Sequence, residues 1–578
     1  MVEDVYEPLS RYRDEFRARH AELTRTRFRE LVERSGVDVR ANRLLASRIR
    51  GLERQSRSLQ GRIALWGVLA GVCFLAAVVG GAALWFGVPA PDTPARMGVY
   101  CGAVAAVAAG VLAVRACLRL TGALHDLQAG IVQMQARARS MLEPLFGLFS
   151  WDMPVKLVEE TVPRLAFDPY FTAKRLEDLH RLCGWSDAFN DGKSVLGSQS
   201  GVINGNPFVF ADCLVAGWGR KTYRGSLEVS WLEEEEDDRG RTRLVRRYET
   251  LRASVEKPCP EYVRDKLLVY GNDAAPDLTF TRRPSDLTGE QGGFFKSWRK
   301  RRARKRLEAF SRNLDDDSNY TIMANHEFET LFETMDRNNE VQYRVLFTAL
   351  AQRQMLALVN DRTVGYGDDF TFEKRRKINV IRAGHLDRAE LDTDPARYGH
   401  WDFDEVARIF RSFNEAFFKD VYFSLAPLLA IPLYQQTRPH ADIWKGIVPE
   451  SPSSFWEHEA LANSHGEEAF RPHGCVTRCL LKTQVVERDA EGARVAVTAH
   501  GYRTEDRVDY VSVRGGDGHS HDVPVHWDEY LPVSRTREMV LTERATPADR
   551  FSAAFSRSAA TACRRSIRSY LHEVCQKS

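Results

Sequence analysis

Two long apolar stretches near the amino terminus constrain the fold of this chain more than any other feature. They cover residues 63–88 and 98–118, and each is longer than the roughly 18 residues that indicate a transmembrane helix. Many arginines lie on the outer flanks of both stretches, whereas the only charged residues of the connecting loop 89–97 are Arg96 and Asp92. Because positively charged flanks stay in the cytoplasm, the sequence predicts a two-span hairpin with both termini on the cytoplasmic side.

Two alternatives to membrane insertion explain the sequence less well. Buried core helices of a soluble protein would not have such polar flanks, and a cleaved signal peptide would not follow the arginine-rich segment 1–62. Small residues recur four positions apart within the stretches, which lets helix backbones approach closely. The spans are therefore expected to pack on each other or on a second copy; the small residues are Gly67, Gly71, Gly98, Gly102, Ala106 and Gly110.

Apolar residues continue with heptad spacing on both outer sides of the spans. After the second span they are Leu120, Leu124, Leu127, Ile131, Met134, Ala138, Met141 and Leu145. Before the first span they are Leu45, Ile49, Leu52, Leu59 and Ile63, with Ser56 as a polar interruption. A membrane turn makes the two helices antiparallel, so we expect them to pair as a coiled-coil stalk. The alternative is that each helix packs separately against the globular region.

The rest of the chain is long enough for several domains and has little net charge. The chain has 578 residues and a formal charge of +3, so net charge indicates no particular partner. Its ten cysteines include no CxxC pair, which is typical of reduced thiols in the cytosol. The arm before the first span is expected to form two helices with a break at Ser35-Gly36.

The cytosolic part alternates between strand-like and helix-like patterns. We expect strands at 202–210, 214–218, 226–232 and 243–255, with a hairpin tip at 233–240, and again at 476–485, 495–500, 508–513 and 523–527. The apolar run 421–434 is too short to span a bilayer and predicts a buried core segment. Pro547 is expected to open a last helix.

The sequence thus predicts an α+β protein: a helical hairpin with two transmembrane helices and an antiparallel coiled-coil stalk, then mixed cytosolic domains with antiparallel sheets and a helical middle segment. The expected segments are a cytosolic helical arm (1–62), the transmembrane hairpin (63–118), a stalk helix (119–150), a β-rich domain (151–295), a helical segment (296–440) and a β-meander with a carboxy-terminal helix (441–578).

One motif copies the potassium-channel selectivity filter letter for letter. Residues 363–368 read Thr-Val-Gly-Tyr-Gly-Asp, but a filter needs a membrane helix on each side, and the charged run 373–377 follows directly. We therefore interpret the motif as a glycine-containing loop between helices. Neither His326-Glu327 nor His458-Glu459 has the second histidine of a zincin helix. The members of a Ser-His-Asp triad need not be close in sequence, so that possibility stays open, although there is no GxSxG motif.

Two groups of metal-type ligands remain as candidates. His519 and His521 would share one face of a strand with His526 nearby, a spacing that zinc can use, yet they follow a Gly-rich turn where exposed polar residues are ordinary. His473, Cys475 and Cys479 have no companion pair at zinc spacing. The sequence therefore predicts no metal, no cofactor and no catalytic residue.

A basic run is the strongest electrostatic feature. Tethered to a bilayer, it is expected to contact anionic headgroups, with nucleic acid as the less favoured ligand and a solvated connector helix as the alternative. The run consists of Lys296, Arg299, Lys300, Arg301, Arg302, Arg304, Lys305 and Arg306.

Three stretches resemble a group of bacterial membrane proteins that have an amino-terminal two-span hairpin and a large cytosolic region. They are 328–359 (FETLFETMDRNNEVQYRVLFTALAQRQMLALV), 417–436 (FFKDVYFSLAPLLAIPLYQQ) and 510–533 (YVSVRGGDGHSHDVPVHWDEYLPV). No activity is assigned to that group, so the resemblance implies a bacterial inner-membrane setting and no site.

These observations favour a membrane-anchored cytosolic adaptor or assembly protein without enzymatic activity, acting as a homo-oligomer or with a protein partner. The alternative is a membrane-tethered metal-dependent hydrolase or nuclease whose acidic and histidine residues meet only in the folded protein.

Overall fold

The fold is a mixture of long helices and antiparallel sheets. The computed structural model describes residues 7–86, 94–236, 242–285, 323–334, 336–439, 451–489, 492–542, 561–564 and 567–571. The chain divides into two compact units. We call Arg25–Phe149 with Pro395–Ser412 the helical unit, and Met1–Thr24, Ser150–Asp394 and Phe413–Ser578 the sheet unit.

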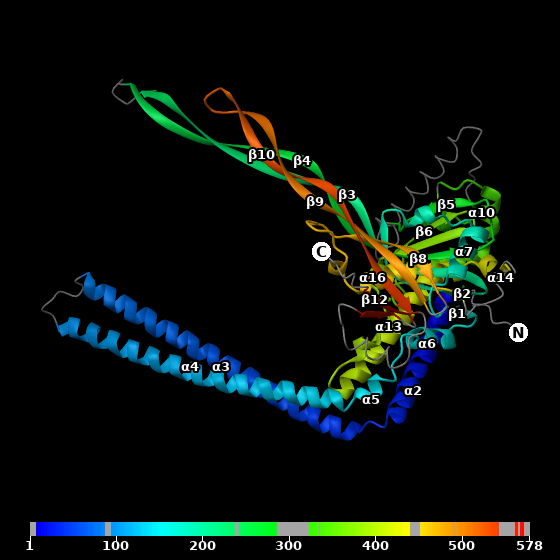
Figure 1. The fold of residues 1–578 in the computed structure, drawn as a ribbon, viewed down its shortest axis with the longest axis horizontal. Helices are drawn as coiled ribbons and strands as arrows, with labels where there is room; N and C mark the ends of the chain where they lie inside the picture. The colour runs from blue at the N-terminus through cyan, green and yellow to red at the C-terminus, as the bar shows by residue number, and fades with distance from the viewer. Residues whose placement is uncertain are drawn as a thin grey trace. The chain divides into compact units, whose positions relative to one another are not determined.

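Two helices of great length dominate the helical unit and lie side by side (Figure 1). They are α3 (Val39–Trp85) and α4 (Pro94–Ser140), accompanied by α5 (Glu143–Phe146) and by α2 (Arg17–Ser35) from Arg25 onward. The expected break at Ser35-Gly36 is confirmed, since α2 ends there and the Asp38 side chain caps α3. Both α3 and α4 are long and apolar enough to cross a membrane.

The two long helices pack in antiparallel order through the residues of the heptad pattern. Ile49, Ile131 and Ala138 form a buried cluster, and Leu45, Leu52, Leu127 and Met134 pack against it. Beside this cluster, Gln135 donates a hydrogen bond of 3.0 Å to Glu53. Nearer the other end of the pair, a Cβ added to Gly110 would lie 3.2 Å from the Phe74 ring. The expected antiparallel pairing of the two helices is therefore present.

Seven strands form the first sheet of the sheet unit, in the order β1-β2-β3-β4-β7-β6-β5, with antiparallel neighbours. The strands are β1 (Leu165–Phe167), β2 (Lys193–Ile203), β3 (Asn206–Glu236), β4 (Thr242–Gly271), β5 (Thr279–Arg282), β6 (Phe370–Arg375) and β7 (Ile378–Ala383).

The expectation of a helical segment over 296–440 is wrong at β6 and β7. Both strands lie inside that segment and complete the first sheet. Along β6, buried residues alternate with more exposed ones, which is the period of a strand. The turn between the two strands is tight, and Arg376 takes a φ of 58° there.

Five strands form the second sheet, in the order β11-β12-β10-β9-β8. They are β8 (Leu480–Arg488), β9 (Gly492–Arg514), β10 (Ser520–Thr542), β11 (Thr561–Arg564) and β12 (Ile567–Leu571). The expected strands 495–500 and 508–513 are one continuous strand, β9. The expected helix from Pro547 and most of the expected hairpin tip beyond Glu236 lie outside the described residues.

Two pairs of strands continue beyond their sheets as long ribbons. β3 loses its neighbour β2 after Val215, and β9 loses β8 after His500, but β3–β4 and β9–β10 stay paired. Figure 1 shows the green and the orange ribbon running together. Leu251, Val523 and Val525 on these ribbons are buried, and a Cβ added at Gly225 on β3 would meet the backbone of Pro524 and Val525 on β10. We call the two packed ribbons, residues 216–236, 242–262 and 501–533, the β arm.

Helices of the sheet unit pack on its sheets and supply an aromatic core. The remaining helices and single turns of the described residues are α1 (Pro8–Arg11), η1 (Tyr12–Phe16), α6 (Met153–Thr161), α7 (Ala173–Cys183), η2 (Asp187–Asn190), α9 (His326–Phe332), α10 (Glu340–Leu346), α11 (Ala349–Asn360), α12 (Gly384–Arg388), η3 (Pro395–Tyr398), α13 (Phe403–Leu429), α14 (Pro432–Gln436), α16 (Phe455–Ser464) and η4 (Glu467–Ala469). Of these, η3 and the part of α13 up to Ser412 belong to the helical unit. The run 421–434 is almost wholly buried in this core, which confirms the prediction of a core segment.

Candidate functional site

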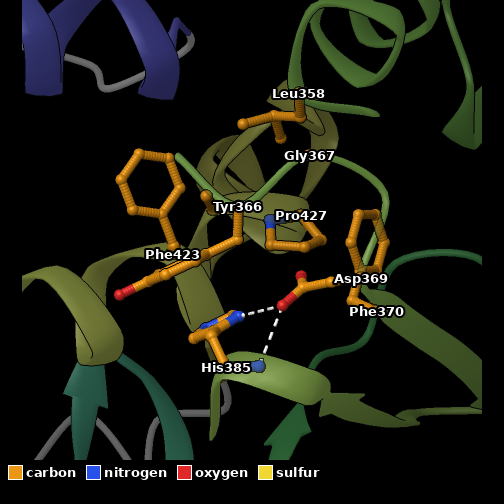
Figure 2. A pocket seen from close by; sticks show the side chains of 9 residues that line it. Leu358, Tyr366, Gly367, Asp369, Phe370, His385, Phe423 and Pro427 are labelled. Atoms are coloured by element: carbon orange, nitrogen blue, oxygen red, sulfur yellow. Dashed lines mark hydrogen bonds and ion pairs between the residues drawn. The ribbon is translucent and has the colours of Figure 1, made fainter. Parts of the chain in front are cut away.

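A small pocket lies beneath the filter-like motif of the sheet unit (Figure 2). The motif belongs to the loop 361–369, which connects α11 to strand β6. The pocket has room for about one water molecule. Its lining residues are Leu358, Tyr366, Gly367, Asp369, Phe370, His385, Phe423, Ala426 and Pro427.

The loop folds around one carboxylate. Asp361 accepts the backbone N–H groups of Val364 and Gly365. Gly367 has a φ of 70°, and a Cβ there would lie 2.6 Å from the Asp361 carbonyl oxygen. Gly367 therefore serves a tight turn, whereas a Cβ at Gly365 would lie 2.6 Å from the Phe423 ring. The expected loop is confirmed, but it joins a helix to a strand and not two helices, and no membrane helix flanks it as a channel filter requires.

Three side chains from distant parts of the chain form a hydrogen-bonded series at this pocket. His385, on α12, places Nδ1 2.8 Å from Asp369 Oδ2, and its backbone N–H donates to the same oxygen over 2.9 Å. Figure 2 marks both contacts. On the other side of the ring, Nε2 lies 3.1 Å from the hydroxyl of Ser424 on α13. The order Asp-His-Ser and these distances match those of a hydrolase triad.

Tyr366 and Asp420 add an aromatic ring and a second carboxylate to the contacts around His385. The Tyr366 ring stacks on the His385 ring, with centroids 4.2 Å apart. Its hydroxyl donates to Asp420 Oδ1, and burial raises the pKa of Asp420. Burial also raises the pKa of Tyr366, and the hydrogen bond to Asp420 adds to that shift. The Lys419 ammonium group lies 4.4 Å from the Tyr366 ring centroid.

The serine at the end of the series is not poised as a nucleophile. Ser424 is fully buried, and its hydroxyl donates to the Asp420 carbonyl oxygen over 2.8 Å. Because a serine has one hydroxyl proton, the proton that Ser424 donates to the Asp420 carbonyl oxygen is not directed at His385 Nε2. A hydrolase needs the reverse arrangement, and it needs space for a substrate. In this conformation the series links the loop, α12 and α13.

The three candidate metal ligands of the β arm do not converge. His521 Nε2 pairs with Asp517 over 2.8 Å, whereas His526 pairs with Asp506 over 3.2 Å. His519 lies in the turn before β10, where its backbone N–H donates to Asp517. Within the described residues, no group of three or more His, Cys, Asp or Glu side chains is arranged to hold a metal ion.

The second candidate group is partly assembled. The thiols of Cys475 and Cys479 lie 3.6 Å apart, but His473 is exposed. The basic run from Lys296 to Arg306 lies outside the described residues.

Helix α16 contains buried charged residues and includes the His458-Glu459 pair of the sequence analysis. Glu459 accepts the N–H of Val195 and faces Lys482, and burial raises its pKa to about 7. Glu457 accepts from Arg564 over 2.7 Å and from Phe171 N–H over 2.9 Å. His458 pairs with Ser453. These contacts tie α16 to its neighbours, so the His-Glu dipeptide here has a structural use.

No signal in the sequence could have grouped Asp369, His385 and Ser424. They lie in a loop, in a short helix and near the carboxy-terminal end of a long helix, and none belongs to a catalytic motif. Comparisons with protein-family models, with curated proteins and with solved structures gave no match.

Proposed function

We propose that this protein is a membrane-anchored adaptor or assembly protein, in which α3 and α4 cross the bilayer and the sheet unit binds a partner in the cytosol. One observation carries the proposal: the apolar parts of both long helices are exposed. Only 6% and 11% of the residues in their most apolar windows are buried. A core helix of a soluble protein would be mostly buried, whereas lipid-facing side chains have no need of protein contacts.

The exposed apolar regions of the two paired helices begin at the same level. Leu65 and Leu118 are both largely exposed, and Ile63 faces Cys117 near this level. From Leu65 to Trp85 the helix rises about 30 Å, close to the thickness of a bilayer core. Arg62 and Arg119 lie just outside the apolar region, and Trp66 and Trp85 lie near its two ends. This order of charge, aromatic ring and aliphatic residue is typical of membrane spans.

The small residues of the spans support association with a second copy. A Cβ on Gly110 would meet Phe74, but Gly67, Gly71, Gly98 and Gly102 have open space beside them. These four glycines therefore do not serve the pairing of α3 with α4. In a bilayer they leave room for a close helix of another copy, and we propose a homo-oligomer on that basis.

The β arm is the proposed partner-binding element. Beyond Val215 the β3–β4 ribbon extends for up to about 65 Å. On its outward face Leu232, Leu244 and Tyr248 are 57%, 60% and 74% exposed. Alternate residues of a strand lie on one face, and even-numbered residues of β3 pair with even-numbered residues of β4. The three side chains therefore share one face of the ribbon. Exposed apolar side chains on an extended ribbon suit binding to another protein. Contact of the basic run with anionic headgroups remains part of this proposal.

Membrane topology provides the first test. Single cysteines placed at Arg57 and in the loop 89–97 of a chain with its other cysteines replaced would be labelled in intact cells by a membrane-impermeant maleimide. We expect labelling in the loop and none at Arg57 until the cells are opened. Extraction of the protein from membranes by alkaline carbonate, or labelling of both positions in intact cells, would contradict the two-span arrangement.

A photo-crosslinking amino acid on the β arm tests the adaptor function. At Tyr248 it faces outward, whereas at Trp231 it faces the other ribbon. We expect a discrete intermolecular product from position 248 in cells and only intramolecular products from position 231. Equal products from the two positions, or none from position 248, would count against a partner on the outward face.

A serine hydrolase, which differs from the metal-dependent hydrolase or nuclease of the sequence analysis, is a second candidate because of the Asp369, His385 and Ser424 series. Its test is reaction with a fluorophosphonate probe, which labels activated serines. Because Ser424 is buried and donates to a carbonyl group, we expect no labelling. Labelling that disappears in Ser424→Ala would favour the hydrolase instead.

A further inference from the structure

The segment 475–479 lies at the base of the β arm, just before β8. Val476 N–H donates to the Tyr502 carbonyl over 2.9 Å, and the Thr477 hydroxyl accepts from Tyr502 N–H over 3.0 Å. The hydroxyl of Tyr262, on β4, lies 3.2 Å from the same Thr477 hydroxyl. The segment therefore contacts both ribbons of the arm where they leave the sheets.

Cys475 and Cys479, at the two ends of this segment, face each other. Their sulfur atoms are 3.6 Å apart; Cys479 is 1% exposed and Cys475 is half-buried. Gly501, on β9, lies beside the two thiols. A Cβ added at Gly501 would lie 2.5 Å from Cys475 Sγ and 3.1 Å from Cys479 Sγ. The absence of a side chain at position 501 thus leaves room for the thiol pair.

We propose that Cys475 and Cys479 form a redox modification site that closes to an intramolecular disulfide by exchange with a low-molecular-weight disulfide. The sulfur atoms need to approach from 3.6 Å to about 2.05 Å, which rotation of the two side chains can supply. The bond would close the turn that holds Thr477 against Tyr262 and Tyr502, and so fix the base of the β arm.

The exchange takes two steps. The Cys475 thiolate, the more accessible of the pair, attacks one sulfur of the small disulfide, forms a mixed disulfide and releases one small thiolate. Cys479 then loses its proton and attacks Cys475 Sγ, which expels the second small thiol. In total two protein thiols are oxidised, two electrons pass to the small disulfide, and two small thiols form.

The surroundings support this order of attack. Burial and the hydrogen bond with Cys475 raise the pKa of Cys479 to about 12, so Cys479 is the poorer first nucleophile. Once a mixed disulfide forms on Cys475, Cys479 lies close enough to resolve it.

Peptide mapping of the full-length protein in detergent tests the site. The protein is equilibrated with defined ratios of reduced and oxidised glutathione, its free thiols are alkylated, and it is digested with trypsin. Arg478 lies between the cysteines, so the disulfide would join the peptide Cys479–Lys482 to the peptide that ends at Arg478. We expect this linked pair in the native chain and in Cys259→Ser, and its loss in Cys475→Ser.

The inference is overturned if both cysteines stay open to alkylation at every ratio, if glutathione remains attached to Cys475, or if Cys475 links to another cysteine. Gly501→Ala gives an independent test because both thiols are kept. Its methyl group should push the sulfur atoms apart and lower the equilibrium constant for disulfide formation about ten-fold relative to the native chain. An unchanged constant in a folded Gly501→Ala protein would also overturn the inference.

Discussion

At the scale of single residues, burial decides the state of Glu459. Its carboxyl group is enclosed between β2 and β8, where burial raises the pKa to about 7 despite Lys482 and the Val195 N–H. The unfolded chain titrates this group near 4.5. Between pH 4.5 and 7 the folded protein therefore retains a proton that the unfolded chain releases. As the pH rises through this range, Glu459 lowers the free energy of unfolding.

Replacing this carboxyl by an amide should remove that pH dependence. In Glu459→Gln the decline in the free energy of unfolding between pH 4.5 and 7 should shrink by about 2–3 kcal/mol relative to the native chain. Denaturant unfolding at several pH values measures it. The matched control is Glu487→Gln, an exposed residue of β8, which should leave the pH profile unchanged. Parallel profiles for the native chain and Glu459→Gln would contradict the prediction.

The turn between β2 and β3 depends on two residues with positive φ. Asn204 and Gly205 have φ of 50° and 80°, and Ile203 pairs with Asn206, as in a two-residue hairpin. The Asn-Gly pair is a strong hairpin signal, yet the sequence interpretation ran one strand across it, from 202 to 210. This local feature could have been predicted from the sequence.

Gly205→Ala should destabilise the sheet unit by about 1 kcal/mol, because alanine at this φ is strained. Gly217→Ala is the matched control: it lies in β3 without a positive φ and has open space beside it. A shift of the urea midpoint in Gly205→Ala, with little or none in Gly217→Ala, is the expected result. Equal shifts would mean that the turn does not require the positive φ.

At the scale of elements, helix periodicity was easier to interpret than strand length. The heptad residues predicted the α3–α4 pairing because the repeat of a helix is a local property of the sequence. The sequence prediction divided β3 and β9 into shorter strands, whereas each is continuous in the structure. Asp212 forms a bidentate pair with Arg264 on β4, so the partner strand keeps β3 continuous.

The helix pairing can be checked by cysteine crosslinking. Glu53 and Gln135 lie within hydrogen-bond distance, so Glu53→Cys with Gln135→Cys should form a disulfide on mild oxidation. Glu53→Cys with Arg119→Cys should not, because Arg119 is about 24 Å further along α4. Equal crosslinking of both pairs, or none of the first, would contradict the observed register. Non-reducing electrophoresis after cleavage of the connecting loop separates the outcomes.

At the scale of the whole molecule, contacts between the two sheets hold the β arm together. Lys257, on β4, pairs with Asp509 on β9 over 2.6 Å and lies over the Trp527 ring. Lys221 pairs with Asp528 over 3.1 Å. At Gly225 the ribbons come so close that an added Cβ would lie 2.0 Å from the Pro524 carbonyl oxygen. Because backbone atoms meet there, a side chain cannot be accommodated by rotation alone.

Gly225→Ala should therefore separate the ribbons locally. We expect amide hydrogens around Val523 and Val525 to exchange at least about ten-fold faster than in the native chain, since their burial depends on this contact. Gly217→Ala, with open space beside it, should leave that exchange unchanged. Unaltered exchange in Gly225→Ala would show that the ribbons are not held by this approach.

The sequence by itself determined the features that depend on local periodicity: two long apolar helices, their heptad pairing and a mixed α and β remainder. The spacing of apolar residues is a property of one continuous segment of the sequence, so it can be recognised without knowing how the chain folds. Only the tertiary structure decided that Asp369, His385 and Ser424 meet, that Cys475 and Cys479 share the space beside Gly501, and that two ribbons form one arm. These groupings join residues from separate elements, and the path of the chain, not the spacing along it, brings them together.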